Sequence, residues 1–309
     1  MKFASDLVPL VTSQVIVPLL LLWWLVAPPR PEGQDGWSSR ANWALHAVVA
    51  VAGVAFVLTV GAQSWTSVYV GAGLLGGLVG ALWRSARELP DTWGPFRTGE
   101  AWGEKLLVGA QLLLGLVYIP LSAYAATGYT TGEEAVALRF PLEDGVYIVG
   151  QGGSTPLINY HNTSETQEYA VDLVKLTAWG TRAQGIYPDA LDRYAIYGDT
   201  LHSPCDGRVE TAVSRRPEYA PPARDEAHPA GNHVVLRCKG VRVHMAHLIP
   251  ASVSVNPGDA VQTGAPLGRI GNSGNSSEPH LHIHATRAGE GVPLTFNGRF
   301  LVRNSLVWR

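Results

Sequence analysis

The residues with the most evident chemistry are three histidines that alternate with apolar residues in the segment Pro279-His280-Leu281-His282-Ile283-His284. Alternation with a period of two is typical of a β-strand and places the three imidazoles on one face. A zinc site needs nitrogen ligands at a fixed separation, and a His-x-His pair on a strand supplies two of them. The alternative is a strand whose histidines merely face solvent, so the partners of this strand decide between the two.

Two upstream residues are candidates to complete such a site. Asp172 interrupts the apolar run Tyr169–Val174, and an ionised carboxylate in that setting needs a partner. His161 follows Ile158-Asn159-Tyr160. One carboxylate and two imidazoles leave a fourth zinc position open for water, which is typical of hydrolytic rather than structural zinc. A structural salt bridge is the alternative for Asp172.

The elements that carry these residues lie in a C-terminal half that differs from the N-terminal half. Every histidine except His46 follows Thr127, whereas nearly all long apolar runs precede it. Three of these stretches lack charge and can hold membrane helices of about 20 residues. Because Gln63–Ser67 divides the middle stretch with polar residues, we expect four spans, without the polar face of helices buried in soluble proteins. They lie at about 7–27, 43–62, 67–83 and 106–126.

The basic residues predict an orientation. Arg30 and Arg40 follow the first span, and four basic residues lie between the third and fourth spans, namely Arg84, Arg87, Arg97 and Lys105. Lys2 is a minor contrary signal. Loops rich in Lys and Arg favour the cytoplasm. We therefore expect residues 1–127 to anchor the protein in the cytoplasmic membrane as a helical bundle, and residues 128–309 to lie on its outer side.

The C-terminal half is expected to be an all-β domain with its core at about 140–290. Short apolar runs separated by Gly, Pro, Asn and Asp indicate strands at 145–149, 233–238, 241–248 and around His280. Helix is plausible only around Tyr187–Tyr194. The stretch 214–231, rich in Pro, Arg and acidic residues, is expected to be a surface loop.

The two cysteines of the chain, Cys205 and Cys238, both lie in this half. A disulfide is chemically permitted outside the cytoplasm, and it would contribute about 3 to 4 kcal/mol by chain entropy. We favour the disulfide over two buried thiols. The absence of further cysteines argues against a thiolate zinc cluster.

Several ordered motifs of this half resemble the lysostaphin-type or LytM-type zinc endopeptidases, which cut peptidoglycan peptides. The resemblance runs from about Phe140 to Ala285 and implies an antiparallel β-sheet domain. Its motifs are Asn159-Tyr160-His161, Gln167-x-Tyr169-Ala170-x-Asp172, Ser203-Pro204-Cys205-Asp206-Gly207, Gly231-Asn232-His233-Val234-Val235-Leu236, Ala246-His247-Leu248, the Gly-rich 254–264, and 267–282 with its closing Pro279-His280-Leu281-His282.

The resemblance implies a role for each candidate residue. It assigns three ligands to one zinc ion, namely His161, Asp172 and His282. It assigns the catalytic acid–base work beside the metal to two histidines, His247 and His280. Because the chain has no His-Glu-x-x-His motif, a histidine is also the natural group for moving protons near the zinc.

One departure from the family concerns the spacing of the first two ligands. The family pattern is His-x-x-x-Asp, whereas His161 and Asp172 are 11 residues apart, so Glu165 at the shorter spacing is a rival ligand. We favour Asp172, because Glu165 lies among polar residues and Asp172 has the apolar strand context.

The remaining histidines have weaker expectations. His284 shares the strand face of His282, and a role beside the site is about as plausible as simple exposure. His244 lies three residues before His247 and is expected on the opposite strand face if the strand is regular. Three others are expected to be ordinary polar surface residues, namely His202, His228 and His233.

The sequence therefore predicts a multi-pass membrane protein that displays a zinc endopeptidase outside the cytoplasm, acting on peptidoglycan stem peptides or cross-bridges. Two alternatives stay open: a non-catalytic scaffold that controls another cell-wall enzyme, and a protease of extracytoplasmic proteins. The expected partners are peptidoglycan peptides and the lipid bilayer, with no nucleic acid.

Overall fold

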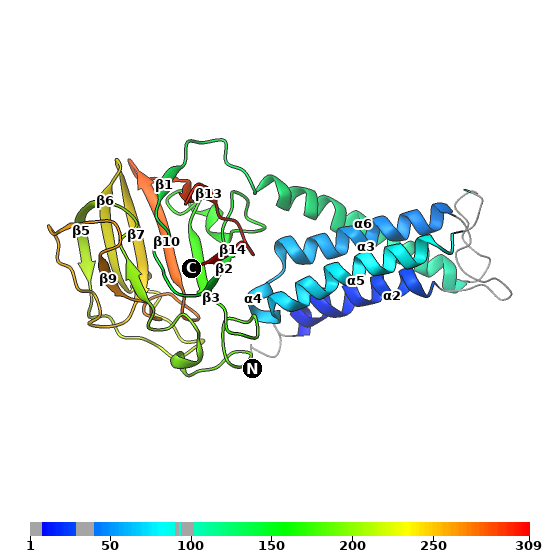
Figure 1. The fold of residues 1–309 in the computed structure, drawn as a ribbon, viewed down its shortest axis with the longest axis horizontal. Helices are drawn as coiled ribbons and strands as arrows, with labels where there is room; N and C mark the ends of the chain where they lie inside the picture. Colours follow the sequence, from blue (N-terminus) through cyan, green and yellow to red (C-terminus); the bar gives the residue numbers. More distant parts are fainter. Residues whose placement is uncertain (1–7, 29–39, 90–92, 94–101) are drawn as a thin grey trace. The chain divides into compact units, whose positions relative to one another are not determined.

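The computed structural model describes residues 8–28, 40–89, 93 and 102–309. Its contacts divide the chain into two compact units, Met1–Ala126 and Thr127–Arg309. The first is helical and the second is built of strands (Figure 1). The two units are described separately below.

Within its described residues, the helical unit contains four helices that are long and apolar enough to cross a membrane. They span Val8–Val26, Arg40–Val60, Val68–Ala86 and Val108–Thr127. The four predicted spans are therefore confirmed in number and approximate position, although the second begins at Arg40, three residues earlier than expected. Two residues on which the orientation partly rests, Arg30 and Arg97, lie outside the described residues. The orientation stays a prediction.

Local sequence explains where these helices deviate. The first contains a π-helical turn, Thr12–Ile16, before α2 (Val17–Val26). Pro18 has no N–H to donate to the carbonyl four residues earlier, which favours this wider turn. The polar segment that separates the second and third spans forms a single helical turn, α4 (Gln63–Thr66), rather than a simple turn. Ser67, at a φ of 83°, ends it.

The helices pack closely around a shared apolar core. A Cβ atom on Gly53 of α3 (Arg40–Val60) would lie 2.8 Å from a terminal methyl of Leu21 of α2, so a larger residue there would make Leu21 shift. On α6 (Trp102–Thr127), the ring of Tyr118 lies 5.3 Å from that of Phe56. The third long helix, α5 (Val68–Ala86), adds Leu74 and Leu78 to the same core. The unit is therefore a four-helix bundle.

The C-terminal unit is built on one large antiparallel sheet. Its strand order is β14-β2-β3-β10-β7-β6-β5-β8, with β11 pairing to β10. The bounds are β2 (Val146–Gln151), β3 (Val171–Lys175), β5 (Gly207–Val213), β6 (Asn232–Cys238), β7 (Val241–Leu248), β8 (Ala260–Val261), β10 (Leu281–Arg287), β11 (Glu290–Val292) and β14 (Leu306–Trp308). The predicted all-β antiparallel fold is thereby confirmed, with the four expected strands present as β2, β6, β7 and β10.

Two smaller sheets complete this unit. One joins β1 (Val136–Leu138), β12 (Leu294–Phe296) and β13 (Arg299–Phe300), and the other joins β4 (Thr200–His202) to β9 (Pro266–Arg269). The β1–β12 pair is parallel, which the sequence did not predict. The expected helix around Tyr187–Tyr194 is wrong, because the chain there forms only a 3₁₀ turn, Leu191–Arg193.

The loop 214–231 joins β5 to β6 and packs against the segment that precedes β10. Its Asp225 N–H donates to the carbonyl of Gly274 at 2.8 Å, and Asn272 Nδ2 donates to the carbonyl of Tyr219 at 2.8 Å. This loop therefore supports the chain that leads into the histidine strand.

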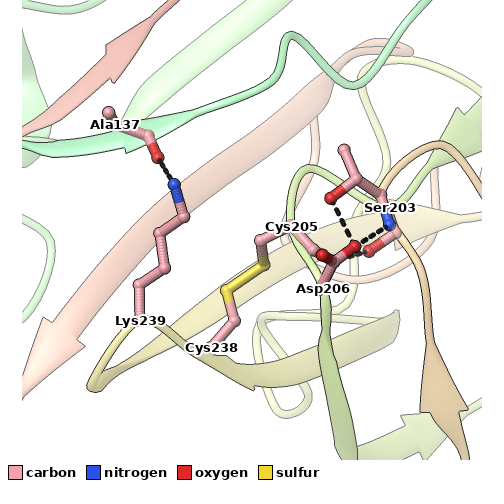
Figure 2. The surroundings of a disulfide bond; sticks show 7 residues. Ala137, Ser203, Cys205, Asp206, Cys238 and Lys239 are labelled. Carbon is pink, nitrogen blue, oxygen red and sulfur yellow. Dashed lines mark hydrogen bonds between the residues drawn. A yellow bond between two sulfur atoms is a disulfide. The ribbon is translucent and has the colours of Figure 1, made fainter.

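The disulfide favoured from the sequence is present. Cys205, just before β5, bonds to Cys238 at the end of β6, and both side chains are buried (Figure 2). The bond closes the end of the β5–β6 pair that lies opposite the 214–231 loop. Next to it, Lys239 Nζ donates to the carbonyl of Ala137 at 2.6 Å, which connects this end to β1.

Candidate metal centre

The turn that carries His161 is held by a buried asparagine. Asn159 caps the 3₁₀ turn Tyr160–Thr163, and its Oδ1 accepts from the N–H of His161 at 3.2 Å. Its Nδ2 donates to the carbonyl of Ala170 at 3.1 Å, just before β3. Because Asp172 lies on β3, Asn159 fixes the histidine turn against the strand that bears the carboxylate.

The three predicted zinc ligands lie together. Asp172 and His282 are direct partners in the β3–β10 register, so their side chains share a face. Asp172 Oδ1 is 2.8 Å from His282 Nδ1, and Oδ2 is 2.9 Å from His161 Nε2. One potential ligand atom from each residue lies within 4.8 Å of the others, and all three residues are less than a tenth exposed. Glu165 is exposed and is not part of this group.

The electrostatics of this group suit a cation. Burial opposes ionisation of Asp172, but the charges and hydrogen bonds of the neighbouring histidines outweigh it and hold the pKa of the carboxyl well below its usual range. Burial lowers the pKa of His282, although the hydrogen bond that its ring donates to the Asp172 carboxylate acts in the opposite direction. An ionised carboxylate beside a neutral imidazole has the protonation that metal ligation requires.

His247 reaches the same face through a β-bulge. On β6, Asn232 pairs with Leu248 and Val234 pairs with Met245, so two steps on β6 match three on β7. The extra residue and the φ of 69° at His247 turn its side chain toward the site. The rings of His247 and His280 lie 4.7 Å apart.

This bulge overturns the expectation that His244 and His247 lie on opposite faces. His244 pairs directly with His284, and their rings stack at 4.4 Å with an interplanar angle of 5°. His244, His247, His282 and His284 therefore share one face of the sheet. Alternation fails here because β7 is not regular between Met245 and Leu248.

Backbone carbonyls fix the proton positions on the two predicted catalytic histidines. His247 Nδ1 lies 2.8 Å from the carbonyl of Ser273, and His280 Nδ1 lies 2.8 Å from the carbonyl of Glu278. A carbonyl only accepts, so each Nδ1 carries a proton, and in a neutral ring Nε2 then keeps its lone pair. Burial, together with His280 and His282, lowers the pKa of His247 well below its usual range, so this imidazole is neutral.

His284, the third histidine of the strand, is partly buried and contacts His282 rather than facing solvent. His284 Nδ1 is 2.9 Å from His282 Nε2. Burial lowers the pKa of His284 to about 2 and that of His244 to about 4, in each case with help from neighbouring histidines. Among the others, His228 is exposed as expected and pairs with Asp225, whereas His202 and His233 are partly buried.

A buried ion pair that the sequence did not reveal supports the segment before His280. Arg182 Nε donates to Glu278 Oε2 at 2.6 Å, and the Arg182 side chain is 1% exposed. Tyr187 donates its hydroxyl proton to the carbonyl of Ser277 at 2.8 Å. Arg182 and Tyr187 therefore fix the position of residues 277–278, which immediately precede His280.

Comparison with known proteins agrees with this fold. Residues 188–294 match the model of peptidase family M23, which confirms the resemblance to lysostaphin-type peptidases in this part of the chain. The match covers about a third of the chain and lies within the C-terminal unit. The matched range contains His247, His280 and His282, whereas His161 and Asp172 precede it. No curated protein matches the chain.

Solved structures similar to this chain include three peptidases. A zinc-containing peptidase from Vibrio cholerae is 18% identical over 51% of this chain and 39% of its own, with a TM-score of 0.32. Pseudoalterin, an M23 metalloprotease from the deep sea, is 17% identical over 57% of this chain and 100% of its own, at 0.34. The catalytic domain of lysostaphin from Staphylococcus simulans is 23% identical over 34% of this chain and 76% of its own, at 0.22. The chain thus spans less than two thirds of the Vibrio protein.

Proposed function

We propose that this protein is a membrane-anchored zinc metalloendopeptidase that hydrolyses peptide bonds in peptidoglycan stem peptides or cross-bridges. The observation that carries the proposal is the convergence of His161, Asp172 and His282 on one buried point, with His247 and His280 beside it. Residues 1–127 act as the four-helix anchor, and residues 128–309 form the peptidase domain.

The donor set of the site fits one Zn²⁺ ion. Two imidazole nitrogens and one carboxylate oxygen are ligands that zinc accepts, and three protein ligands leave one position open. The ligand atoms would be His161 Nε2, His282 Nδ1 and an oxygen of Asp172. Zinc held there would acidify a water molecule and polarise the scissile carbonyl.

The two remaining histidines perform the proton transfers. Because their Nδ1 protons are held by carbonyls, His247 and His280 each present a basic Nε2. His280 Nε2 lies 3.7 Å from Asp172 Oδ1, at the edge of the ligand group. One histidine accepts the proton of the attacking water at Nε2 and then returns it to the departing amine. The other histidine can donate a hydrogen bond to the developing oxyanion when its own Nε2 is protonated.

The location proposed for this chemistry is the outer side of the cytoplasmic membrane. Four apolar helices in the described chain indicate membrane association. Four basic residues favour a cytoplasmic position for the helix ends at which they lie, namely Arg40, Arg84, Arg87 and Lys105. Four spans return the chain to the side of the membrane on which the first span began. The residues before the first span are therefore placed outside together with the C-terminal unit. Tethering confines hydrolysis to wall peptides near the membrane.

The test uses the full-length protein in detergent. Purified peptidoglycan is digested with the wild type, with His247→Ala and with His228→Ala, and the soluble peptides are identified by mass spectrometry. His228 is exposed and is not part of the ligand group, so its variant is a matched control. We expect new peptide termini from the wild type and the control, and at least about 100-fold fewer from His247→Ala.

Each outcome has a distinct meaning. If the wild-type digest contains no peptides beyond those of an enzyme-free control, the proposal is contradicted and a non-catalytic scaffold is favoured. Cleavage of an unfolded test protein without cleavage of peptidoglycan favours a protease of extracytoplasmic proteins.

A further inference from the structure

His284 is the nearest polar neighbour of His282 on the side away from the metal ligands. Its Nδ1 lies 2.9 Å from His282 Nε2, while His282 Nδ1 lies 2.8 Å from Asp172 Oδ1. The two nitrogens of the His282 ring thus face different partners. Because His282 is 6% exposed, water does not replace either partner readily.

The hydrogen bond decides which nitrogen of His282 can bind a metal. A neutral imidazole carries one proton, so one ring nitrogen donates and the other accepts or ligates. When His284 Nδ1 accepts, the proton of His282 is on Nε2. Its Nδ1 then presents a lone pair to the point where Asp172 and His161 converge.

The acceptor ring is itself held in place. His244 stacks on His284 at 4.4 Å and 5°, and His244 Nε2 lies 3.4 Å from Thr286 Oγ1. The β7–β10 register places His244 directly opposite His284. A stacked ring on a paired strand has little freedom to rotate, so the position of His284 Nδ1 is set before any metal binds.

We propose that His284 is a positioning residue for the metal centre: by accepting the Nε2 proton of His282, it fixes the tautomer and ring orientation that present Nδ1 as a zinc ligand. His244 acts with it by holding the acceptor ring in plane. The inference rests on the proposed zinc site and deepens it. It predicts a loss of metal affinity that does not depend on catalysis. Removal of such a partner typically lowers metal affinity 10- to 100-fold.

The test compares two substitutions that differ in hydrogen bonding. In His284→Asn, the Oδ1 atom is the same number of bonds from Cα as the histidine Nδ1 and can accept the same proton. In His284→Leu, a side chain of similar bulk offers no acceptor. Full-length wild type, both variants and His228→Leu are purified in detergent, stripped of metal and titrated with Zn²⁺ against a chelating dye.

We expect His284→Leu to bind zinc about 10- to 100-fold more weakly than the wild type, and His284→Asn and His228→Leu to stay within about threefold. The visible spectrum of the cobalt-substituted protein, which reports ligand geometry, should change in the Leu variant and return toward that of the wild type in the Asn variant. Thermal unfolding of the metal-free variants shows which of them are folded.

Three results overturn the inference. A folded His284→Leu variant with wild-type zinc affinity shows that the hydrogen bond does not matter. Equal losses in the Leu and Asn variants show that the role is packing rather than proton acceptance. Failure of the wild type itself to bind zinc removes the metal centre of the proposed function. By contrast, wild-type zinc binding without peptidoglycan cleavage contradicts the proposed substrate and leaves the role of His284 intact.

Discussion

Reduction of the Cys205–Cys238 disulfide should destabilise the C-terminal unit without weakening its metal centre. The cysteines are separated by 33 residues. For a loop of this length, the chain-entropy relation gives about 4 kcal/mol of stabilisation at 25 °C. The folded strands should change little on reduction, because β5 and β6 are also held by backbone pairing next to the disulfide, for example between Arg208 and Arg237. The loss should therefore come from the unfolded chain.

The three proposed zinc ligands lie outside the closed loop, on β3, on β10 and in the turn of residues 160–163. Reduction should therefore leave zinc affinity unchanged while the folded state remains populated. Urea unfolding of the C-terminal unit, followed in the full-length protein by brief proteolysis at each concentration, measures the stability. With an m-value of about 2 kcal/mol/M, the midpoint should fall by about 2 M.

A double variant, Cys205→Ala with Cys238→Ala, is the control for the reductant. It should have the lower midpoint with or without reductant, and the reductant should not shift it. A midpoint that moves by less than about 0.5 M on reduction would refute the chain-entropy reasoning. A parallel loss of zinc affinity would show that the β5–β6 end of the sheet is coupled to the metal centre.

Four further predictions concern the site and its support. His161→Ala and Asp172→Ala should each reduce zinc affinity at least about 100-fold, measured by dye competition, and unchanged affinity in both would reject the ligand assignment. Arg182→Met should destabilise the C-terminal unit by about 3 kcal/mol in urea, because it leaves the carboxylate of Glu278, whose side chain is 14% exposed, without its partner; removal of both partners should cost less. Burial, with neighbouring histidines, lowers the pKa of His244 to about 4, compared with about 6.5 in the unfolded chain. Between these two pH values the folded state binds fewer protons than the unfolded state, so the metal-free protein should lose stability as the pH falls from about 6.5 to about 4. The loss, measured by urea unfolding at each pH, should be smaller in His244→Phe. A phosphatase reporter fused after Arg309 should be active outside the cytoplasm, and activity only of a cytoplasmic reporter there would reverse the orientation.

The elements predicted well are those whose signal is local and repetitive. Uncharged apolar stretches of about 20 residues indicate membrane-type helices regardless of what surrounds them. The strands around Val149 and Leu236 follow from short apolar runs bounded by turn residues. His282 and Asp172 were found because a histidine pair and an isolated carboxylate are unusual in such strands.

The features that sequence reasoning missed depend on pairing between distant segments. Arg182 and Glu278 are 96 residues apart, and nothing in either local sequence identifies the other as its partner. The sheet face on which His247 lies depends on the β-bulge, where three steps on β7 match two on β6. Prediction from alternation assumes equal numbers of steps on both strands and cannot reveal a bulge. The contact between His282 and His284 depends on rotamers that residue spacing does not specify.

The bulge on β7 means that the proposed zinc ligands and His247 share one sheet face but are placed there by different features of the backbone. The ligands His161, Asp172 and His282 are placed by β3, β10 and a capped turn, whereas His247 is placed by one extra residue in β7. Because His247 lies three residues after His244, a β7 strand with regular alternation would turn its side chain to the opposite face, without altering any of the three ligand side chains. The proposed metal binding and the proposed proton transfer therefore depend on separate features of the backbone, and the second can be lost while the first is kept.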